Sequence, residues 1–345
     1  MILSLTRMTL VFIGGGLGYF GTMSLEAVEA LKKCEIVYVD VYTSVWSEDF
    51  FTELKKIVPN LVYADRKLLE DNVHKIIGEA GEKRVGILVP GDPFIATTHN
   101  AIRTLAHRKR VDVEIIHGVS VISASISRSG LHAYKFGKIS TIPKNADLDQ
   151  LGYVLDVLEQ NLSNGLHSLV LLDTAEGGLT IGEAVQNLLK ASERKRLSWL
   201  NEDMVAIGLA RIGFPDFKIK VSTLKFLAES MFPPPPHSII VPAKLHFIEQ
   251  ESLSTYGEAA VVGKLVENNP AKTRVRGYVE KCRRIIHQVS GTTGLDEYIK
   301  YVSNYVDDVE AFMERDDLQN ALLAIGYAEG LLDALRFLKR VDFTW

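Results

Sequence analysis

The residues best suited to chemistry lie in one short stretch, residues 90–99, with the sequence Pro-Gly-Asp-Pro-Phe-Ile-Ala-Thr-Thr-His. The stretch follows an apolar run at 85–89 that predicts a buried strand, and α/β folds bind ligands beyond the carboxyl ends of such strands. Asp92 stands between a glycine and a proline, where its carboxylate could face a cleft and favour a cationic ligand. The competing interpretation is that Asp92 only shapes a turn or caps a helix.

A second loop, residues 14–18 (Gly-Gly-Gly-Leu-Gly), follows the apolar run at 10–13. Glycines let the backbone approach a ligand closely, and the amides of a following helix favour an anion or carboxylate. No Gly-Lys-Ser/Thr follows, so the loop is not a Walker motif, and it does not match Gly-x-Gly-x-x-Gly in a compelling form. A tight turn without a ligand is the alternative.

The elements that must position these loops alternate between strand-like and helix-like segments over residues 8–250, which predicts an α/β fold with a largely parallel sheet. The pattern restarts after about residue 140. We therefore expect two α/β domains, 8–143 and 144–254, with a site in the cleft between them. The strands are predicted at 10–13, 35–39, 85–89, 113–116, 169–172, 204–209 and 238–241, and helices at 24–33, 120–127 and 180–190.

The sequence changes character after about residue 255, and residues 255–345 predict a third, helical domain. Apolar residues recur at helical spacing over 275–289, 295–312 and 318–335, which predicts three helices. Asp316 and Asp317 are candidate N-caps. The charge-rich stretch 258–276 is expected to include a linker, although 261–266 could open a helix. The apolar stripes form either the module's own core or a docking or dimerisation surface.

Composition excludes several classes. The chain has 345 residues, a hydrophobic fraction of 47% and a net charge of −4, without the basic excess of a nucleic-acid-binding surface. Cys34 and Cys282 are too few for a disulfide scaffold or a zinc site, which suits a reducing cytosol. Cys282 lies in a helical pattern with apolar neighbours and is predicted to be a buried thiol. No apolar run reaches the roughly 20 residues of a membrane span. Arg7 interrupts the apolar N-terminus, so no signal peptide is expected, and Met8 could be the natural start.

The remaining motifs connect the chain to a family. Besides residues 90–99, they are residues 42–44 (Tyr-Thr-Ser), 117–120 (His-Gly-Val-Ser), 130–138 (Gly-Leu-His-Ala-Tyr-Lys-Phe-Gly-Lys), 209–211 (Leu-Ala-Arg) and 235–242 (Pro-Pro-His-Ser-Ile-Ile-Val-Pro). On these motifs, residues 8–253 resemble the archaeal diphthine synthases, of the tetrapyrrole-methylase-like group of S-adenosyl-L-methionine (SAM) methyltransferases. Related corrinoid and RNA methylases generally lack the Ala-Thr-Thr-His continuation and the Tyr-Lys-Phe-Gly block. Residues 325–335 resemble a small archaeal domain of unknown function.

The resemblance implies two α/β domains with SAM in the cleft between them, S-adenosyl-L-homocysteine as product, no metal, a cytoplasmic location and usually a homodimer. Neither membrane nor direct nucleic-acid binding is expected. Carried over position by position, the cofactor-binding residues are Leu17, Asp92, Ile95, Ser120, Val121, Leu172, Ile212 and His237. The apolar residues in this set could instead be ordinary core residues.

The substrate that the resemblance implies is elongation factor 2, at a histidine carrying a 3-amino-3-carboxypropyl group whose amine is methylated repeatedly. A methylase of the same fold acting on a corrinoid or RNA, and a SAM-binding protein with reduced or lost catalysis, are the alternatives. The family continues its first glycine loop with acidic residues, whereas residues 18–24 hold none, and its aromatic-rich segment is missing at 144–155. His99, His132 and His237 are candidate bases, and no catalytic residue is assigned.

Overall fold

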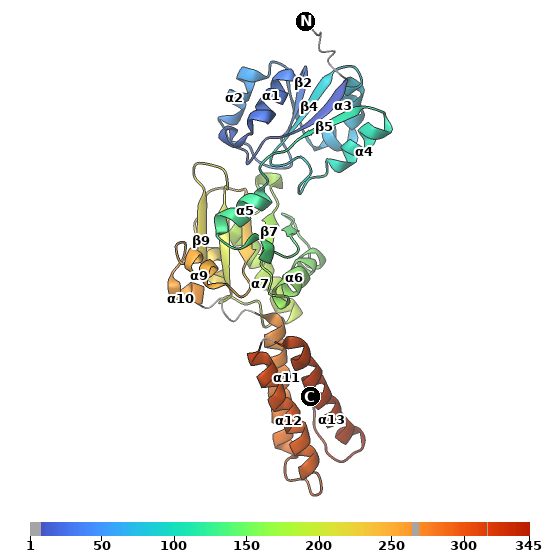
Figure 1. The fold of residues 1–345 in the computed structure, drawn as a ribbon, viewed down its shortest axis with the longest axis vertical. Helices are drawn as coiled ribbons and strands as arrows, with labels where there is room; N and C mark the ends of the chain where they lie inside the picture. Colours follow the sequence, from blue (N-terminus) through green and yellow to red (C-terminus); the bar gives the residue numbers. More distant parts are fainter. Residues whose placement is uncertain (1–7, 264–268, 316) are drawn as a thin grey trace. The chain divides into compact units, whose positions relative to one another are not determined.

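The computed structural model describes residues 8–263, 269–315 and 317–345 (Figure 1). They form two compact units, of which the first holds two β-sheets with their helices and the second holds three long helices. The predicted α/β fold with a helical C-terminal module is therefore confirmed. Within the described ranges, none of the helices combines the length and the apolar character that crossing a membrane requires.

The first sheet consists of five parallel strands in the order β3-β2-β4-β1-β5. Helices cover both of its faces, which is why its central strands are continuous apolar runs (Figure 1). Its elements are β1 (Thr9–Gly14), α1 (Leu25–Lys33), β2 (Ile36–Asp40), α2 (Phe50–Ile57), β3 (Leu61–Ala64), α3 (Val73–Ala80), β4 (Arg84–Val89), α4 (Asn100–Arg108) and β5 (Asp112–Ile116).

The helices that follow the neighbouring strands β1 and β4 cover opposite faces of this sheet. Helix α1 packs into one core cluster through Ala27 and Leu31, and α4 packs into the other through Ile102 and Ala106. The chain therefore diverges between the carboxyl ends of β1 and β4, which makes this point a topological switch point, where open α/β sheets bind ligands. Both loops that the sequence singled out leave the sheet there.

Three glycines hold the loops at these strand ends together. A Cβ atom on Gly14 would lie 2.3 Å from the backbone nitrogen of Gly118, and one on Gly118 would lie 2.2 Å from the carbonyl oxygen of Gly91. The Gly91 N–H also donates a hydrogen bond of 2.5 Å to the carbonyl oxygen of Gly16. The three backbones occupy the space that any side chain would need, so only glycine permits this approach.

The second sheet has the strand order β6-β7-β10-β8-β9 and is mixed. Strand β6 pairs with β7 in parallel, and the other three pairs are antiparallel. Its elements are α5 (Val121–Ser129), β6 (Ser140–Ile142), α6 (Leu148–Ser163), β7 (Ser168–Leu172), α7 (Ile181–Lys195), β8 (Val205–Ala210), β9 (Lys218–Thr223), α8 (Leu224–Glu229), β10 (His237–Val241), α9 (Phe247–Leu253) and α10 (Ala259–Gly263).

The expectation of a largely parallel sheet is thus confirmed for the first sheet and wrong for the second. Residues 211–217 connect β8 to β9, and such a short link cannot make the crossover of a dozen or more residues that a parallel pair requires. The predicted domain limits, 8–143, 144–254 and 255–345, stay a prediction. In the structure, strand β6 already belongs to the second sheet.

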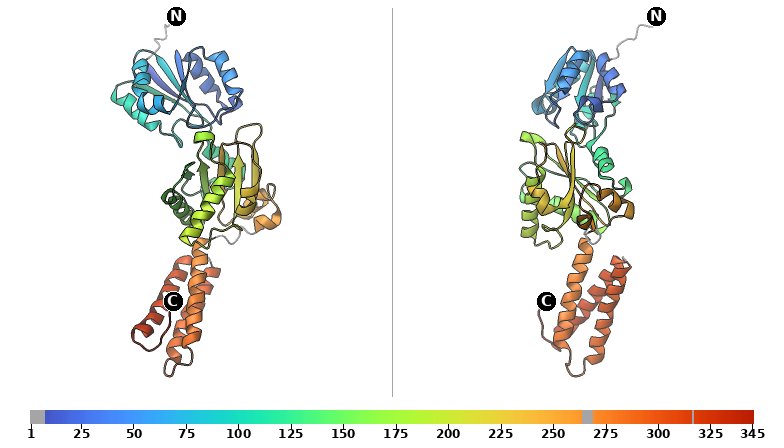
Figure 2. Two further views of the ribbon diagram at one scale, coloured as in Figure 1. Left: turned by 180° about the vertical axis from the view of Figure 1, so that it is seen from behind. Right: turned by 90° about the vertical axis from the view of Figure 1, so that its left-hand side faces the viewer.

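The helical unit consists of α11 (Pro270–Val289), α12 (Asp296–Glu314) and α13 (Leu318–Phe337), which lie side by side in both views of Figure 2. Their stripes form the module's own core, with Cys282, Val302 and Leu332 fully buried. The Asp317 side chain caps α13 by accepting from the Asn320 N–H, as predicted. Asp316 and the part of the predicted 261–266 helix beyond α10 lie outside the described residues.

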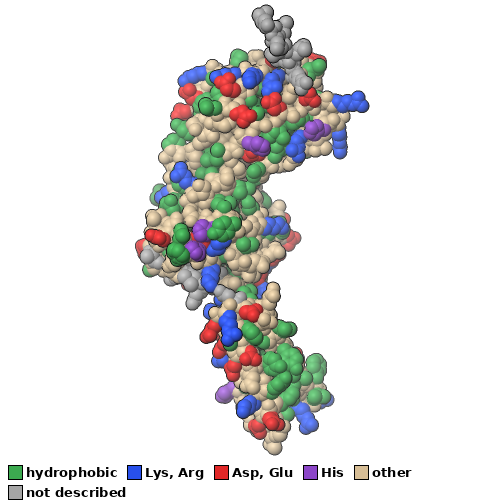
Figure 3. Space-filling model, viewed as in Figure 1, with side chains coloured by type: hydrophobic (Ala, Val, Ile, Leu, Met, Phe, Trp, Pro, Cys, Tyr) green, Lys and Arg blue, Asp and Glu red, His purple; other side chains and the backbone are tan. Residues whose placement is uncertain are grey.

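Apolar side chains also gather on the surface of this unit (Figure 3). On α13 they include Leu323 and Phe337, whose exposed fractions are 73% and 79%. A docking or dimerisation role of the module stays a prediction. Both cysteines are free and buried, as predicted for Cys282, and burial raises the pKa of the Cys34 thiol to about 11 and that of Cys282 to about 12.

The glycine contact leads to a prediction for Gly118→Ala. The added methyl group has no room beside Gly91, so we expect the free energy of unfolding of the first unit to fall by about 2 kcal/mol. Urea unfolding of the full chain, followed by fluorescence, measures the change. The matched control is Gly78→Ala in α3, where a Cβ meets nothing within 4 Å and the change should stabilise by roughly 0.5–1 kcal/mol. Equal effects of the two variants would contradict the packing argument.

Candidate functional site

An inner cavity of about 230 Å³ lies at the carboxyl ends of β1 and β4, lined by residues of both sheets. Loops that follow β1, β2, β4 and β5 supply one part of its wall, and β6, β7, the loop after β8 and the start of β10 supply the other. The lining residues are Gly16, Leu17, Thr43, Ser44, Pro90, Gly91, Ile95, Ala96, Thr97, Ser120, Val121, Thr141, Leu171, Leu172, Asp173, Thr174, Ile212, Pro236 and His237.

The structure brings seven of the eight predicted cofactor residues together around this cavity. They are separated by up to 220 positions in the sequence, from Leu17 to His237. That they bind a cofactor stays a prediction. The seven are Leu17, Ile95, Ser120, Val121, Leu172, Ile212 and His237.

Asp92, the eighth predicted residue, is not part of the cavity wall. Its side chain is buried, with one carboxylate oxygen accepting from the Phe94 N–H at 3.1 Å and the other 2.8 Å from His117 Nδ1. The neighbouring Gly91 lines the cavity instead. Asp92 therefore holds the turn in place, which was the competing interpretation of this residue, and its direct contact with a ligand remains a prediction.

His237 lines the cavity, but both of its ring nitrogens are engaged. Nδ1 accepts a hydrogen bond from the Ile181 N–H at 3.2 Å, and Nε2 donates to the Pro233 carbonyl oxygen at 2.7 Å. Burial lowers the pKa of His237, which favours this neutral form. With its acceptor nitrogen occupied, the imidazole is placed to fix the cavity wall rather than to take a proton.

The turn after β4 is held in an unusual backbone conformation where it borders the cavity. Ala96 has a φ of 56°, a left-handed conformation that costs free energy for a residue with a Cβ atom. Thr97 Oγ1 stabilises the turn by donating to the Pro93 carbonyl oxygen at 2.6 Å. The Ala-Thr part of the Ala-Thr-Thr-His motif thus shapes the wall directly.

An outer cavity of about 1040 Å³ adjoins the inner one and shares Thr43, Ser44, Ala96, Thr97, Thr141, Asp173 and Thr174 with it. Sequence reasoning singled out Thr43 and Ser44 as a motif but assigned no role to Asp173 or Thr174. A signal for Asp173 was present, because it directly follows the buried strand 169–172 at its carboxyl end. The Thr174 hydroxyl donates to the Thr43 carbonyl oxygen at 3.0 Å and so ties the two walls together.

The loop at residues 42–44 is held over both cavities by the fully buried Asp40. Its carboxylate accepts from the N–H groups of Tyr42 and Thr43, at 2.9 and 3.0 Å, and from the Thr43 hydroxyl. His99 lies behind the same carboxylate, with Nε2 at 3.3 Å from Oδ2, and is itself fully buried. His99 therefore sits behind the wall, without access to either cavity.

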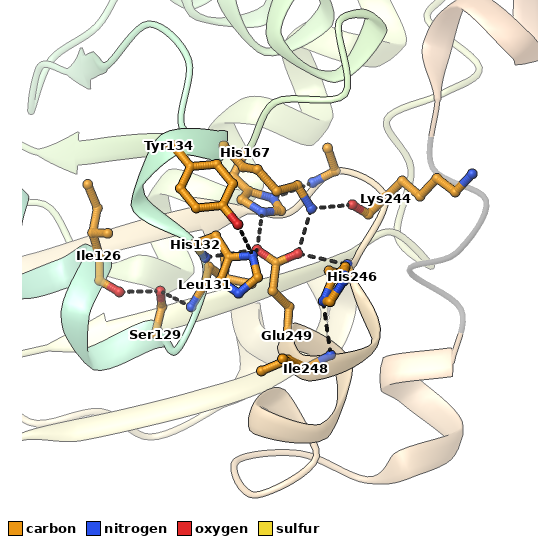
Figure 4. A network of polar contacts seen from close by, with 12 residues as sticks. Ile126, Ser129, Leu131, His132, Tyr134, His167, Lys244, His246, Ile248 and Glu249 are labelled. Carbon is orange, nitrogen blue, oxygen red and sulfur yellow. Dashed lines mark hydrogen bonds and ion pairs between the residues drawn. The ribbon is translucent and has the colours of Figure 1, made fainter.

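His132, the third candidate base, belongs to a separate polar cluster around Glu249 (Figure 4). The fully buried Glu249 carboxylate accepts from the backbone N–H groups of His132 and His246, both at 2.8 Å. It also pairs with the Lys135 ammonium at 2.5 Å and the His167 Nε2–H at 3.0 Å. The block at 130–138 thus fastens the chain to the start of α9 and does not line either cavity.

The cluster sets the protonation of its members. Burial raises the pKa of Glu249, but the Lys135 ammonium and the N–H donors outweigh this effect and hold the pKa at about 2. Burial lowers the pKa of His167, whose Nδ1 accepts from the Ala243 N–H at 2.9 Å. A charged Glu249 beside a neutral His167 accounts for all of these bonds. Among the described residues, no three His, Cys, Asp or Glu side chains are grouped as metal ligands.

Comparison with known proteins identifies two regions. Residues 9–228 match the tetrapyrrole (corrin/porphyrin) methylases, and residues 278–341 match a family described as a protein of unknown function (DUF357). The chain is 41% identical to a diphthine synthase of Staphylothermus marinus over 251 residues, which cover 71% of this chain and 92% of that protein. It is 36% identical to the diphthine synthase of Archaeoglobus fulgidus, over 72% of this chain and 96% of that protein.

A crystal structure of diphthine synthase superimposes with a TM-score of 0.67 and 34% sequence identity, covering 75% of this chain and 99% of that one. The resemblance drawn from the motifs and the expected methylase fold are therefore confirmed, as is the separate helical domain.

The Glu249 cluster predicts that Glu249→Gln destabilises the first unit. Removing the charge leaves the Lys135 ammonium, in a largely buried place, without its charged partner, which costs about 3 kcal/mol. Because folding depresses the pKa of Glu249, its contribution is fully present above the ordinary value of 4.5 and is lost as the pH falls through about 2. Urea unfolding at pH 7 and at lower pH should show the variant and the wild type converging in acid.

The control is Glu53→Gln, which breaks an exposed pair with Lys56 on α2. Exposed pairs of this kind contribute little, so we expect a change near zero at every pH. A constant gap between Glu249→Gln and the wild type from neutral to acid pH would contradict the assignment.

Proposed function

The chain belongs to the tetrapyrrole (corrin/porphyrin) methylase family and, within it, to the diphthine synthases, and we propose that it methylates a modified histidine of elongation factor 2. The methyl donor is SAM and the acceptor is the amine of the 3-amino-3-carboxypropyl group. The observation that carries the proposal is the identity of 41% and 36% to diphthine synthases over 92% and 96% of their lengths. The convergence of the seven residues implied by the resemblance on one cavity at the switch point supports SAM as the donor.

The residues around the inner cavity suit SAM. Leu17, Leu172 and Ile212 provide apolar surface for an adenine and a methionine chain, and the Ser120–Val121 start of α5 provides polar groups. Small-molecule sites usually measure roughly 300–1,000 Å³, so the inner cavity alone is tight and its opening into the outer cavity supplies the remaining room. When bound, SAM supplies a methyl group that its sulfonium already activates.

The protein's own contribution is alignment and exclusion of water. Holding donor and acceptor in line can lower a barrier by roughly 7–11 kcal/mol without a catalytic acid or base. The Asp40-held loop, the Ala96 turn and the Thr174–Thr43 bond give the rigid walls that such alignment requires. The amine must be unprotonated to react, and the bonded ring nitrogens of His237 are not placed to take its proton.

Two alternatives define how the proposal can fail. A corrinoid or RNA methylase would transfer label to those substrates and not to the factor. A SAM-binding protein without catalysis would bind SAM and transfer to none of them. The high coverage of the diphthine synthases, 92% and 96% of the two relatives, favours the factor as substrate.

We further propose that the protein is archaeal and cytoplasmic and acts as a homodimer. These statements rest on the resemblance to the archaeal diphthine synthases. Elongation factor 2 is its proposed protein partner.

The cofactor site is tested by Ile95→Trp. Ile95 lines the inner cavity and is 43% exposed, so a larger side chain there fills the cavity without disturbing the core. We expect the affinity for SAM, measured by calorimetry, to fall at least about tenfold, a loss of about 1.4 kcal/mol. Leu148→Trp on α6, which is 49% exposed and outside the cavity, is the control and should bind normally. Normal SAM binding by Ile95→Trp would place the cofactor elsewhere.

The substrate is tested by incubating the full chain with labelled SAM and elongation factor 2 carrying the aminocarboxypropyl histidine. We expect label on that histidine, identified by mass spectrometry, and none on a factor whose histidine is unmodified, because the amine is then missing. If the protein binds SAM well but transfers no labelled methyl group to the modified factor, the result contradicts the proposal.

A further inference from the structure

We infer that Asp173 binds the substrate amine and that the outer cavity is the binding site for its zwitterionic side chain, an inference that rests on the proposed function. Asp173 follows Leu172 at the end of β7 and contributes to the walls of both cavities. It therefore stands where a donor in the inner cavity and an acceptor in the outer one would meet.

The charges on the walls single out this residue. Among the described residues that line the two cavities, the carboxylates are those of Asp173 and Glu176. Asp173 lines both cavities and is half-buried, whereas Glu176 is exposed and lines only the outer one. The loop after β1, residues 18–24, holds no acidic residue. Asp173 is therefore the carboxylate at the junction of the two cavities.

The Asp173 carboxylate is held in a fixed orientation. One oxygen accepts from the Ala175 N–H at 2.9 Å and the other from the Lys144 N–H at 3.0 Å. A carboxylate offers about four acceptor positions, so two backbone bonds leave capacity for an N–H of the substrate. Fixed acceptors of this kind stabilise charge that develops in a reaction without reorganising.

The opposite charge of the substrate has a counterpart on the same outer cavity. Arg66 lines it, with Nε donating to Glu70 Oε2 at 2.9 Å. Exposed pairs of this kind are weak, so the guanidinium can take a carboxylate as a further partner. A cavity with an acid on one element and a guanidinium on another suits a group that carries both an amine and a carboxylate.

The reaction step explains what Asp173 would do. As the nitrogen lone pair forms the N–C bond, the methyl C–S bond breaks with its electron pair on sulfur, and the nitrogen becomes positively charged. A primary or monomethylated amine then loses a proton to water, whereas a dimethylated amine becomes a quaternary ammonium that keeps its charge. An N–H donated to Asp173 turns the lone pair toward the methyl group, and the carboxylate stabilises the new charge. A primary or monomethylated amine has such an N–H, whereas an unprotonated dimethylated amine has none.

Asp173→Asn is the test, with the full chain, labelled SAM and the modified factor as substrate. We expect the first transfer to slow about a hundredfold. Transfer to the dimethylated amine should slow less, and mass spectrometry of the factor over time resolves these products. Affinity for S-adenosyl-L-homocysteine, measured by calorimetry, should stay within about threefold of wild type, which distinguishes loss of the amine contact from a collapsed wall.

Two variants complete the experiment. Arg66→Met should raise the KM for every transfer equally, because the carboxylate is present throughout. The control is Glu53→Gln, an exposed carboxylate on α2 outside both cavities, which should leave all rates within about twofold. A first transfer by Asp173→Asn within threefold of wild type, or equal slowing of all transfers, would overturn the inference. If the wild type itself methylates no factor, the proposed function is wrong and the inference falls with it.

Discussion

The close approach of three backbones at Gly14, Gly91 and Gly118 is the constraint on which the site depends. Without side chains at these positions, the loops after β1, β4 and β5 can meet at the point where the helices of the first sheet diverge. The Gly91–Gly16 hydrogen bond then fixes the rim of the inner cavity. Glycine is required at these positions because the backbones pack against one another, and the place of the cavity follows from that packing.

Most ionisable groups near the cavities already form hydrogen bonds that hold the fold together. Asp92 holds its turn with Phe94 and His117, Asp40 holds the loop at 42–44, and both nitrogens of His237 are bonded. A site built in this way orients its ligands through rigid walls and has little acid–base capacity. That suits methyl transfer, in which the donor carries the activation and alignment supplies the rate.

The sequence predicted all of the central strands and one edge strand, β5, but missed the other three edges. The missed strands β3, β6 and β9 are short or partly exposed and lack a continuous apolar run. Cofactor positions came from the resemblance, and seven of them share a wall that spacing alone could not bring together. Asp173 was missed because its type is common in turns, although its place after a buried strand was visible.

The family motifs differ in what they can say about chemistry. The block at 130–138 is one of the motifs on which the resemblance rests, yet its Lys135 and His132 fasten a loop to Glu249. Its presence is therefore evidence for the fold and not for catalysis. Residues 90–99 shape the inner cavity, where the proposed cofactor would be compatible with any acceptor. In the proposed function, substrate choice then lies in the outer cavity, where Asp173 and Arg66 stand on different elements. The acid-free loop at 18–24 therefore does not by itself imply lost activity, because the charge that an amine requires can come from the second sheet.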